Sequence, residues 1–224
     1  MRISVDLVCG AQAASNIRQS VCIIIDVLRA SSTIITALAH GYEAVIPVKN
    51  LDALHPPDVC AGEHLGVHGL LTTFGNSPVE LLNAPVTHPH LHLRTTNGTP
   101  CLLAIANTNE ILIGALLNAK AVAQQAYQLA QTKLQHITLV CCGYHEVLEE
   151  DDYITASYIA DYLAKMGARV TFKLKQQENM QEQILATPSA HRLIKLNSRE
   201  DVIFCSIPDK YFVVPYYSHQ VIKL

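Results

Sequence analysis

A short apolar run that ends in a carboxylate constrains this chain more than any other part of its sequence. Residues 22–25 read Cys-Ile-Ile-Ile and are followed directly by Asp26. A run of β-branched residues without polar alternation is typical of a strand that is covered on both faces, as in a parallel sheet. A carboxylate at the end of such a strand is costly to bury unless donors, a cation or a metal ion lie next to it.

The turn after this strand carries groups that bind anions. Arg29 lies three residues after Asp26, and Ser31 and Ser32 follow it. Ligands of parallel α/β sheets bind beyond the carboxyl ends of the strands, where helix N-termini attract anions. One interpretation is a phosphate or carboxylate site with Asp26 as a candidate metal ligand and Arg29 as a clamp. The other is an Asp26–Arg29 turn pair, with a serine only capping the next helix.

Strands and helices alternate along most of the chain. A helix over residues 32–40, closed by Gly41, and a strand over residues 44–48 complete a strand–helix–strand unit, which predicts parallel pairing of its two strands. Three closing strands are predicted without helices between them, at residues 202–206, 212–215 and 221–224. We therefore expect a three-layer α/β fold with a mixed, largely parallel sheet.

Length, composition and charge narrow the class of protein. A chain of 224 residues that is 50% hydrophobic fits a single α/β catalytic domain over residues 1–224, or two intimate lobes. A net charge of −3 gives no electrostatic reason to expect nucleic acid as a partner. No apolar run approaches the roughly 20 residues of a membrane span. The first residues lack a secretion signal, so we expect a cytoplasmic protein.

The cysteines and histidines do not form a recognisable metal or disulfide pattern. Seven cysteines occur without a Cys-x-x-Cys pair, mostly in apolar runs, which favours reduced and buried thiols. There is no His-Glu-x-x-His motif among the eleven histidines. His88, His90 and His92 fall in a passage from a loop to a strand, so we expect them at the surface.

Three later stretches resemble the turn after Asp26 in their chemistry. Glu63 follows a short predicted strand in a long glycine-containing loop. Asn76-Ser77-Pro78 is a helix entry, with Ser77 as the cap and Pro78 at the first helical position. Thr95-Thr96-Asn97-Gly98 follows another strand, and Gly98 allows a ligand to approach the backbone closely. If the sheet brings the strand ends to one rim, these groups surround Asp26.

Several of these sequence segments, taken together, resemble the signatures of one protein family. The segments Asp26-Val27-Leu28-Arg29-Ala30-Ser31-Ser32-Thr33, Ala61-Gly62-Glu63, Gly75-Asn76-Ser77-Pro78 and Thr95-Thr96-Asn97-Gly98-Thr99 are similar to signatures of the 2-phosphosulfolactate phosphatase family, in order and spacing. Cys141-x-Gly143 with Asp152-x-x-x-Ala156 is similar to a further signature. The resemblance covers essentially the whole chain. It implies a phosphatase that depends on Mg²⁺ and hydrolyses 2-phosphosulfolactate or a related phosphorylated 2-hydroxy acid.

The resemblance also implies roles for individual residues. The expected catalytic carboxylates are Asp26, Glu63 and Asp152, of which Asp26 and Glu63 are the expected Mg²⁺ ligands. The expected substrate-binding residues are Arg29, Asn76, Ser77, Thr95, Thr96, Asn97 and Gly98. For Asp152 a second interpretation stays open, because an acid in the first turn of a helix is favourable to the helix dipole. The nucleophile also stays open, with an aspartyl-phosphate at Asp26 or a thiolate at Cys141 as less favoured routes.

Two departures from the family pattern bear on activity. His64 stands where the family usually has arginine, and imidazole cannot offer the bidentate fork of guanidinium. Thr73 stands where the family usually has an acid. An alternative is therefore a non-catalytic α/β protein that binds a phosphorylated small molecule. The sequence leaves the oligomeric state open, with a homo-oligomer allowed.

Overall fold

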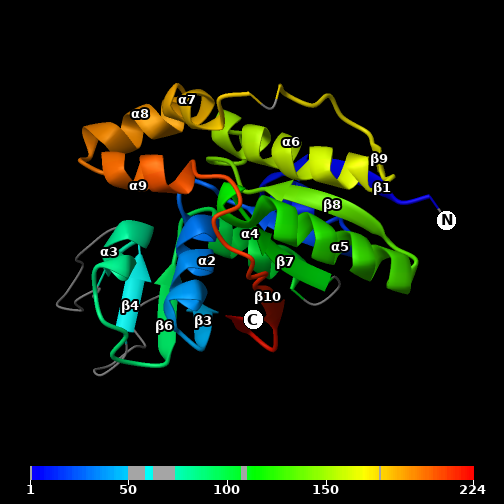
Figure 1. Cartoon of the computed structure of the whole chain (residues 1–224). Coiled ribbons are helices and arrows are strands. Elements are labelled where there is room, and N and C mark those ends of the chain that lie inside the picture. Colours follow the sequence, from blue (N-terminus) through cyan, green and yellow to red (C-terminus); the bar gives the residue numbers. More distant parts are fainter. Residues whose placement is uncertain (1, 50–58, 63–73, 107–109, 177) are drawn as a thin grey trace.

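A computed structural model describes residues 2–49, 59–62, 74–106, 110–176 and 178–224 (Figure 1). Its strands are β1 (Ser4–Cys9), β2 (Ser20–Ile25), β3 (Ala44–Pro47), β4 (Val59–Gly62), β5 (Phe74–Gly75), β6 (His90–Arg94), β7 (Glu110–Gly114), β8 (His136–Cys141), β9 (Arg169–Val170), β10 (Tyr216–Ser218) and β11 (Val221–Lys223). Its α-helices are α1 (Gly10–Ala14), α2 (Ala30–His40), α3 (Pro78–Leu82), α4 (Gly98–Ile105), α5 (Ala119–Lys133), α6 (Glu150–Lys165), α7 (Met180–Leu185), α8 (Pro188–Lys195) and α9 (Arg199–Cys205).

All of these strands belong to one sheet with the order β5-β4-β6-β3-β11-β10-β7-β2-β8-β1-β9. Strands β7, β2, β8, β1 and β9 pair in parallel, and so do β3, β6, β4 and β5. The hairpin of β10 and β11 lies between these two groups and pairs antiparallel with β7 on one side and β3 on the other. The expected mixed, largely parallel sheet is therefore confirmed.

Strand β2 lies near the middle of the sheet and is buried along its whole length. Its side chains alternate between two hydrophobic clusters: Cys22 and Ile24 belong to one, and Val21, Ile23 and Ile25 belong to the other. This alternation follows from the two-residue period of a strand, and the apolar run of residues 21–25 follows from coverage of both faces.

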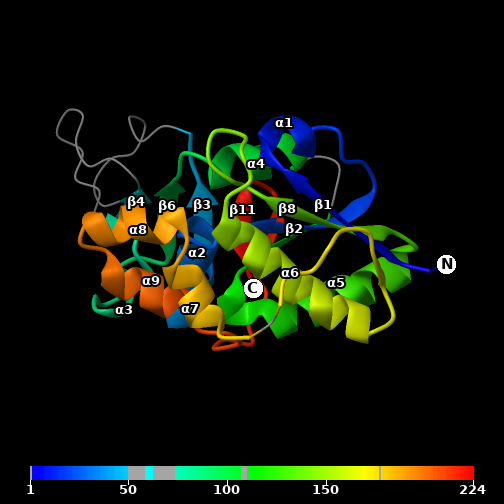
Figure 2. The same ribbon diagram turned by 90° about the horizontal axis from the view of Figure 1, so that it is seen from above.

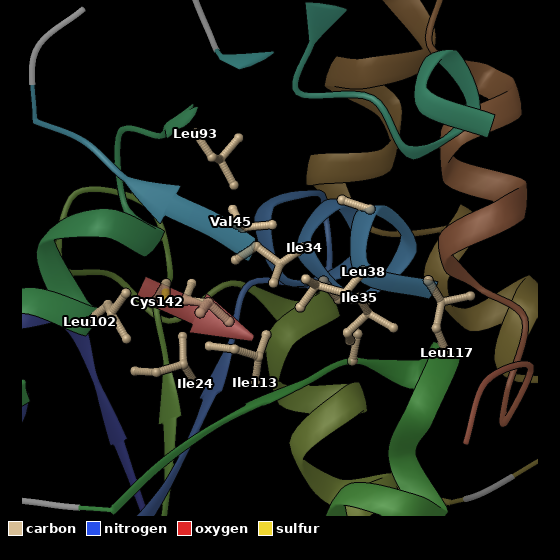
Figure 3. Close-up of a cluster of buried hydrophobic side chains, with 14 of the residues drawn as sticks. Ile24, Ile34, Ile35, Leu38, Val45, Leu93, Leu102, Ile113, Leu117 and Cys142 are labelled. Carbon is tan, nitrogen blue, oxygen red and sulfur yellow. The ribbon is translucent and has the colours of Figure 1, made fainter. Parts of the chain in front are cut away.

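Helices cover both faces, which confirms the three layers. Helices α5 and α6 pack side by side over the face that carries Ile23, while α1 and α4 lie together on the opposite face (Figure 2). Helix α2 contacts β3 and β7. Figure 3 shows Ile24 of β2 and Ile113 of β7 in the same cluster as Ile34 of α2 and Leu102 of α4. None of the described helices is long and apolar enough to cross a membrane.

Several local signals predicted the helix ends correctly. Helix α2 ends at Gly41, which has a φ of 117°, a conformation that glycine adopts at little cost. Helix α3 begins with Pro78 after Ser77, whose side chain accepts a hydrogen bond from the N–H of Glu80 at 3.1 Å.

The predicted parallel pairing of the strands at residues 22–25 and 44–48 is wrong. Strands β7, β10 and β11 stand between β2 and β3, and β3 pairs with β6 and β11 instead. Three antiparallel pairings lie between β2 and β3, so the two strands run in opposite senses and α2 is not a crossover between parallel strands. The strands that separate them come later in the chain, where the local strand–helix–strand pattern carries no information about them.

Two of the three predicted closing strands are also wrong. Residues 202–206 fall largely in α9, and residues 212–215 form no strand, although Pro215 accepts a hydrogen bond from the N–H of Ile113 at 2.9 Å. The run Val202-Ile203-Phe204 has high strand propensity, but Val202 and Cys205 are both fully buried as α9 packs against α3 and α8. Tertiary packing therefore overrides local propensity there. The third segment contains β11, as predicted.

Candidate active site

Asp26 stands at the end of β2 and organises the turn into α2. Its N–H donates to Oγ of Ser31 at 3.0 Å, and its carbonyl oxygen accepts from the N–H of Ser31 at 2.8 Å. Its Oδ1 accepts from the N–H of Ala30 at 3.2 Å. The side chain therefore accepts a hydrogen bond from the first N–H group of α2, and the N-terminus of this helix stabilises its negative charge although Asp26 is only 9% exposed.

Gly98, the first residue of α4, lies against the same carboxylate. A Cβ built on Gly98 would lie 3.0 Å from Oδ2 of Asp26 and 3.1 Å from both Oγ1 of Thr95 and Cβ of Ala30. Only a glycine lets α4 approach the turn this closely. Thr95 is positioned by Thr99, whose N–H donates to Oγ1 of Thr95 at 2.9 Å. The structure thus brings Asp26, Thr95 and Gly98 together.

The contact of Asp26 with Thr95 and Gly98 has a different structural cause from the one expected. Three antiparallel pairings in succession separate β2 from β6, so the two strands run in opposite senses within the sheet order. A shared carboxyl edge of one parallel sheet therefore does not explain the contact. Helix α4 instead packs on β2 and carries its N-terminus to Asp26.

Asp152 in the first turn of α6 joins two strand ends. Its Oδ1 accepts from the N–H of Val27 at 3.0 Å and its Oδ2 from the N–H of Gly143 at 2.9 Å. Burial raises the pKa of Asp152 well above its usual value, and the negative charges of Asp151 and Asp26 raise it further. Asp152 thus holds the turns after β2 and β8 in place. It lies close enough to Asp26 for the charge of Asp26 to raise its pKa.

Arg29 and Ser77 meet at a residue that sequence reasoning missed. Nη1 of Arg29 lies 2.6 Å from Oδ2 of Asp201 and 3.2 Å from Oγ of Ser198. Ser77 donates its hydroxyl to Oδ1 of Asp201 at 2.7 Å. The N–H of Val79 donates to the same oxygen at 3.2 Å, so α3 also begins at this carboxylate. In the described part of the chain the ion pair of Arg29 is with Asp201, not with Asp26 as the turn-pair interpretation expected.

Asn76 precedes this cluster and is completely buried. Asp201 carried no signal in the sequence that could have identified it. It lies directly before a run with strand propensity, outside every motif, and it reaches Arg29 only because α9 packs against α3.

Two cavities open beside the turn of residues 95–98. The larger, of about 520 Å³, is lined in part by Thr95 and Thr96. The other, of about 380 Å³, lies at Thr96 and Asn97 and is bordered by Cys142 and Glu146. The predicted substrate-binding residues of this turn therefore face two neighbouring spaces, and Thr96 borders both.

Of the two predicted Mg²⁺ ligands, Asp26 and Glu63, the structure describes only Asp26. Glu63 lies outside the described residues, as do the two departures at His64 and Thr73. The described residues contain no group of three or more histidine, cysteine, aspartate or glutamate side chains that could hold a metal ion. Mg²⁺ requires less than that, because it keeps several waters and binds one or two carboxylates together with substrate phosphate. A single carboxylate such as Asp26, at the edge of the cavity-lining turn, fits this requirement.

The buried thiols are poor candidates for a nucleophile. Cys141 is fully buried, and burial raises its pKa well above the usual value. The pKa of Cys142 is also raised, first by a hydrogen bond with Cys101 and then by burial. The thiolate is the reactive form of cysteine, so these environments suppress it.

Comparison with known proteins identifies the family of the chain. A family model described as 2-phosphosulpholactate phosphatase matches residues 8–220. The chain is 31% identical over 208 residues to the "Probable 2-phosphosulfolactate phosphatase" of Pseudothermotoga lettingae, with 88% of this chain and 89% of that protein covered. A protein of the same name from Thermotoga petrophila is 34% identical over 203 residues, covering 86% and 87%. One from Thermus thermophilus is 32% identical over 228 residues, covering 96% and 94%. This chain therefore belongs to the 2-phosphosulpholactate phosphatase family, whose name describes a phosphoric monoester hydrolase.

Proposed function

We propose that this protein hydrolyses 2-phosphosulfolactate, or a related phosphorylated 2-hydroxy acid, to the hydroxy acid and phosphate with the help of Mg²⁺. The observation that carries the proposal is the contact between the Asp26 carboxylate and the turn of Thr95 and Gly98. This contact joins a hard oxygen ligand to the N-terminus of α4 beside two cavities.

The N-terminus of α4 supplies the anion-binding part of the site. Its N–H groups and the hydroxyls of Thr95 and Thr96 are the groups that bind phosphate at helix N-termini in other proteins. Asp26 beside them is negatively charged, so a phosphate approaching it meets repulsion. A divalent cation held by Asp26 would remove this repulsion, which supports Mg²⁺ as the cofactor.

The residues that would hold Mg²⁺ are Asp26 and Glu63. When bound, the ion would polarise the phosphoryl oxygens and lower the pKa of a coordinated water. Phosphoryl transfer then depends mainly on position and charge, since the reacting groups must lie in line. Asp152 serves this by fixing the turns at Val27 and Gly143 around Asp26.

Arg29 is the proposed clamp for the phosphoryl oxygens. Its Nη1 is held by Asp201 and Ser198, and its other guanidinium nitrogens make no hydrogen bond to the residues that the structure describes. A guanidinium carries five N–H donors, so anchoring one nitrogen leaves donors for an anion in a fixed orientation.

Measuring phosphate release from 2-phosphosulfolactate and a panel of phosphorylated 2-hydroxy acids, with and without Mg²⁺, tests the proposal. Metal-dependent release is expected. The variant Asp26→Asn should lose at least about 100-fold in activity, because losses of 10- to 100-fold already follow the removal of groups that only orient a metal ligand. Asp161→Asn makes the same chemical change on α6, beside the exposed Lys165, and should be fully active.

The departures at His64 and Thr73 favour one second candidate, a binding protein without turnover. No phosphate release from any substrate, together with a thermal shift in their presence, would support it. A ligand at 100 times its Kd should stabilise the protein by about 2.7 kcal/mol. Phosphate release by wild type that Asp26→Asn leaves unchanged would remove Asp26 from the site. We also propose a cytoplasmic location, which the free state of all seven cysteines supports.

A further inference from the structure

We propose that Lys49 and Arg94 form a second anion subsite, which binds an acid group of the substrate while its phosphate lies at Asp26. This inference rests on the proposed function and assigns a recognition site to two residues that none of the motifs contains. Three observations support it: a cavity of suitable size, the positive charge of the described residues that line this cavity, and the threonines that the cavity shares with the Asp26 turn.

The cavity is the larger of the two beside residues 95–98. Its volume of about 520 Å³ lies within the range of small-molecule sites. Among its described lining residues, Lys49 and Arg94 are cations and none is acidic. The whole chain has 19 acidic and 16 basic residues, so the described part of this lining, with two cations and no acid, is more basic than the chain as a whole.

The two cations come from neighbouring strand ends that the sheet holds in register. Pro47 of β3 pairs with Leu93 of β6, and the N–H of Val48 donates to the carbonyl oxygen of Leu93 at 3.0 Å. One residue further along each strand, Nε of Arg94 donates to the carbonyl oxygen of Lys49 at 3.3 Å. The guanidinium is therefore anchored to the main chain of the other cation. A guanidinium fixed in this way can bind an anion with little loss of its own side-chain entropy.

Hydroxyl groups connect this cavity to Asp26. Thr95 and Thr99 line the 520 Å³ cavity and also a small pocket that Asp26 and Gly98 border. A substrate with its phosphate at Asp26 would therefore have Thr95 and Thr99 between the phosphate and this cavity. The lining of the cavity also includes the apolar side chains of Leu103 and Ala104. This arrangement suits a short aliphatic chain that carries an acid at one end.

The chemical class of the bound group follows from the two cations. Carboxylate and sulfonate both present oxygens that a planar guanidinium can bind with two parallel hydrogen bonds, while an ammonium contributes a point charge. The acid arm of the substrate is therefore either the carboxylate or the sulfonate, and the choice between them can be measured.

Steady-state kinetics of Arg94→Gln and Lys49→Gln on three substrates tests the proposal. The substrates are 2-phosphosulfolactate, 2-phospholactate, which lacks the sulfonate, and ethyl phosphate, which lacks both acids. We expect KM for 2-phosphosulfolactate to rise by about 10- to 100-fold in either variant, the loss typical of a hydrogen bond to a charged group. KM for ethyl phosphate should stay within about twofold of wild type, since removing an interaction affects only ligands that make it.

The KM measured with 2-phospholactate shows which acid group of the substrate, carboxylate or sulfonate, binds in the subsite. A similar rise with 2-phospholactate places the carboxylate in the subsite, whereas an unchanged KM places the sulfonate there. Lys165→Gln, on the exposed end of α6, removes the same charge and should leave all three values unchanged. Because Lys49 is exposed, its variant should fold normally. If Arg94→Gln does not fold, Arg94→Lys replaces it in the test, because lysine keeps the charge but lacks the two parallel N–H donors of the guanidinium.

The outcome also separates this inference from the proposed function. If wild type releases phosphate but both variants keep their KM for 2-phosphosulfolactate, the subsite is overturned and the phosphatase activity stands. If KM rises equally for ethyl phosphate, the cations bind the phosphate itself and the subsite is again overturned. If wild type releases no phosphate from any substrate, the proposed function fails, and with it this subsite.

Discussion

Nη1 of Arg29 lies 2.6 Å from Oδ2 of Asp201, across a sequence separation of 172 residues. The two side chains are largely buried, with exposed fractions of 15% and 5%. Asp201 also accepts the hydroxyl hydrogen bond of Ser77, so one carboxylate joins the turn after β2, the start of α3 and helix α9. The orientation of the proposed phosphate clamp thus depends on a residue outside the motifs.

Replacing Asp201 by alanine should affect both stability and activity. The change leaves the Arg29 charge and the Ser77 hydroxyl without their partner, and breaking a buried pair costs about 3–5 kcal/mol. Asp201→Asn should cost less because it keeps one acceptor, yet kcat/KM should still fall. Urea unfolding and phosphate release measure the two effects. Glu110→Gln breaks the exposed pair with Lys133 and should change stability by no more than about 1 kcal/mol.

Gly98→Ala should reduce activity by displacing Asp26. The new methyl group would lie 3.0 Å from Oδ2 of Asp26, which is too close without movement of α4 or the carboxylate. We expect a stability loss of about 1–3 kcal/mol, as for other overpacked positions, and a fall in kcat. Gly41→Ala is the matched control: its φ of 117° strains alanine, but a Cβ there would lie 4.0 Å from Cγ2 of Val86, which is ordinary contact. It should lose stability while keeping kcat.

Asp151→Asn should stabilise the protein at neutral pH. Burial raises the pKa of Asp151 from the ordinary 3.8 to about 6, so the folded state holds this proton more tightly than the unfolded state does. The stability gained is fully present below pH 3.8 and is lost as pH rises through about 6. Asparagine does not ionise, and it keeps an acceptor for the hydroxyl of Ser189, which lies 2.6 Å from Oδ1 of Asp151.

Urea unfolding at about pH 4.5 and about pH 7.5 checks this sign. The variant should exceed wild type by about 1–3 kcal/mol at the higher pH, from 1.36 kcal/mol for each pKa unit, and the difference should shrink at the lower pH. A difference that does not depend on pH would contradict the raised pKa of Asp151.

Glu146→Ala should loosen helix α1. The Glu146 carboxylate accepts from the N–H groups of Ala11 at 3.2 Å and Gln12 at 3.1 Å, and so caps this five-residue helix from a distant loop. Loss of such a cap costs about 0.5–2 kcal/mol. Amide hydrogen exchange at Ala11 and Gln12 should become faster, with a smaller effect for Glu146→Gln, which keeps one carbonyl acceptor. Unchanged exchange in the alanine variant would show that α1 does not need this cap.

Sequence reasoning succeeded where a signal is local. The apolar run before Asp26, Gly41 after α2, and Ser77-Pro78 before α3 each act through neighbouring backbone, and each predicted element is present. It failed where a segment from later in the chain determines the strand pairing or the secondary structure. The hairpin of β10 and β11 separates β3 from β7, and packing turns residues 202–205 into helix against their strand propensity.

The same distinction applies to the site. The proximity of Asp26, Thr95 and Gly98 was expected from their chemistry, but the path of α4 across β2 that produces it was not. Asp201 and the pair of Lys49 and Arg94 belong to no motif, and only the three-dimensional arrangement identifies them.

The position of the β10–β11 hairpin also has a consequence for biosynthesis. Residues 216–223 occupy the centre of the sheet, between strands made from residues 44–47 and 110–114. While the ribosome is still translating, each parallel half therefore has an exposed inner edge that only this late segment can cover. Unpaired edges promote aggregation of nascent chains. A ribosome stalled shortly before codon 216 should thus expose a chain that chaperones bind, and pairing of residues 216–223 with both halves of the sheet should end that interaction.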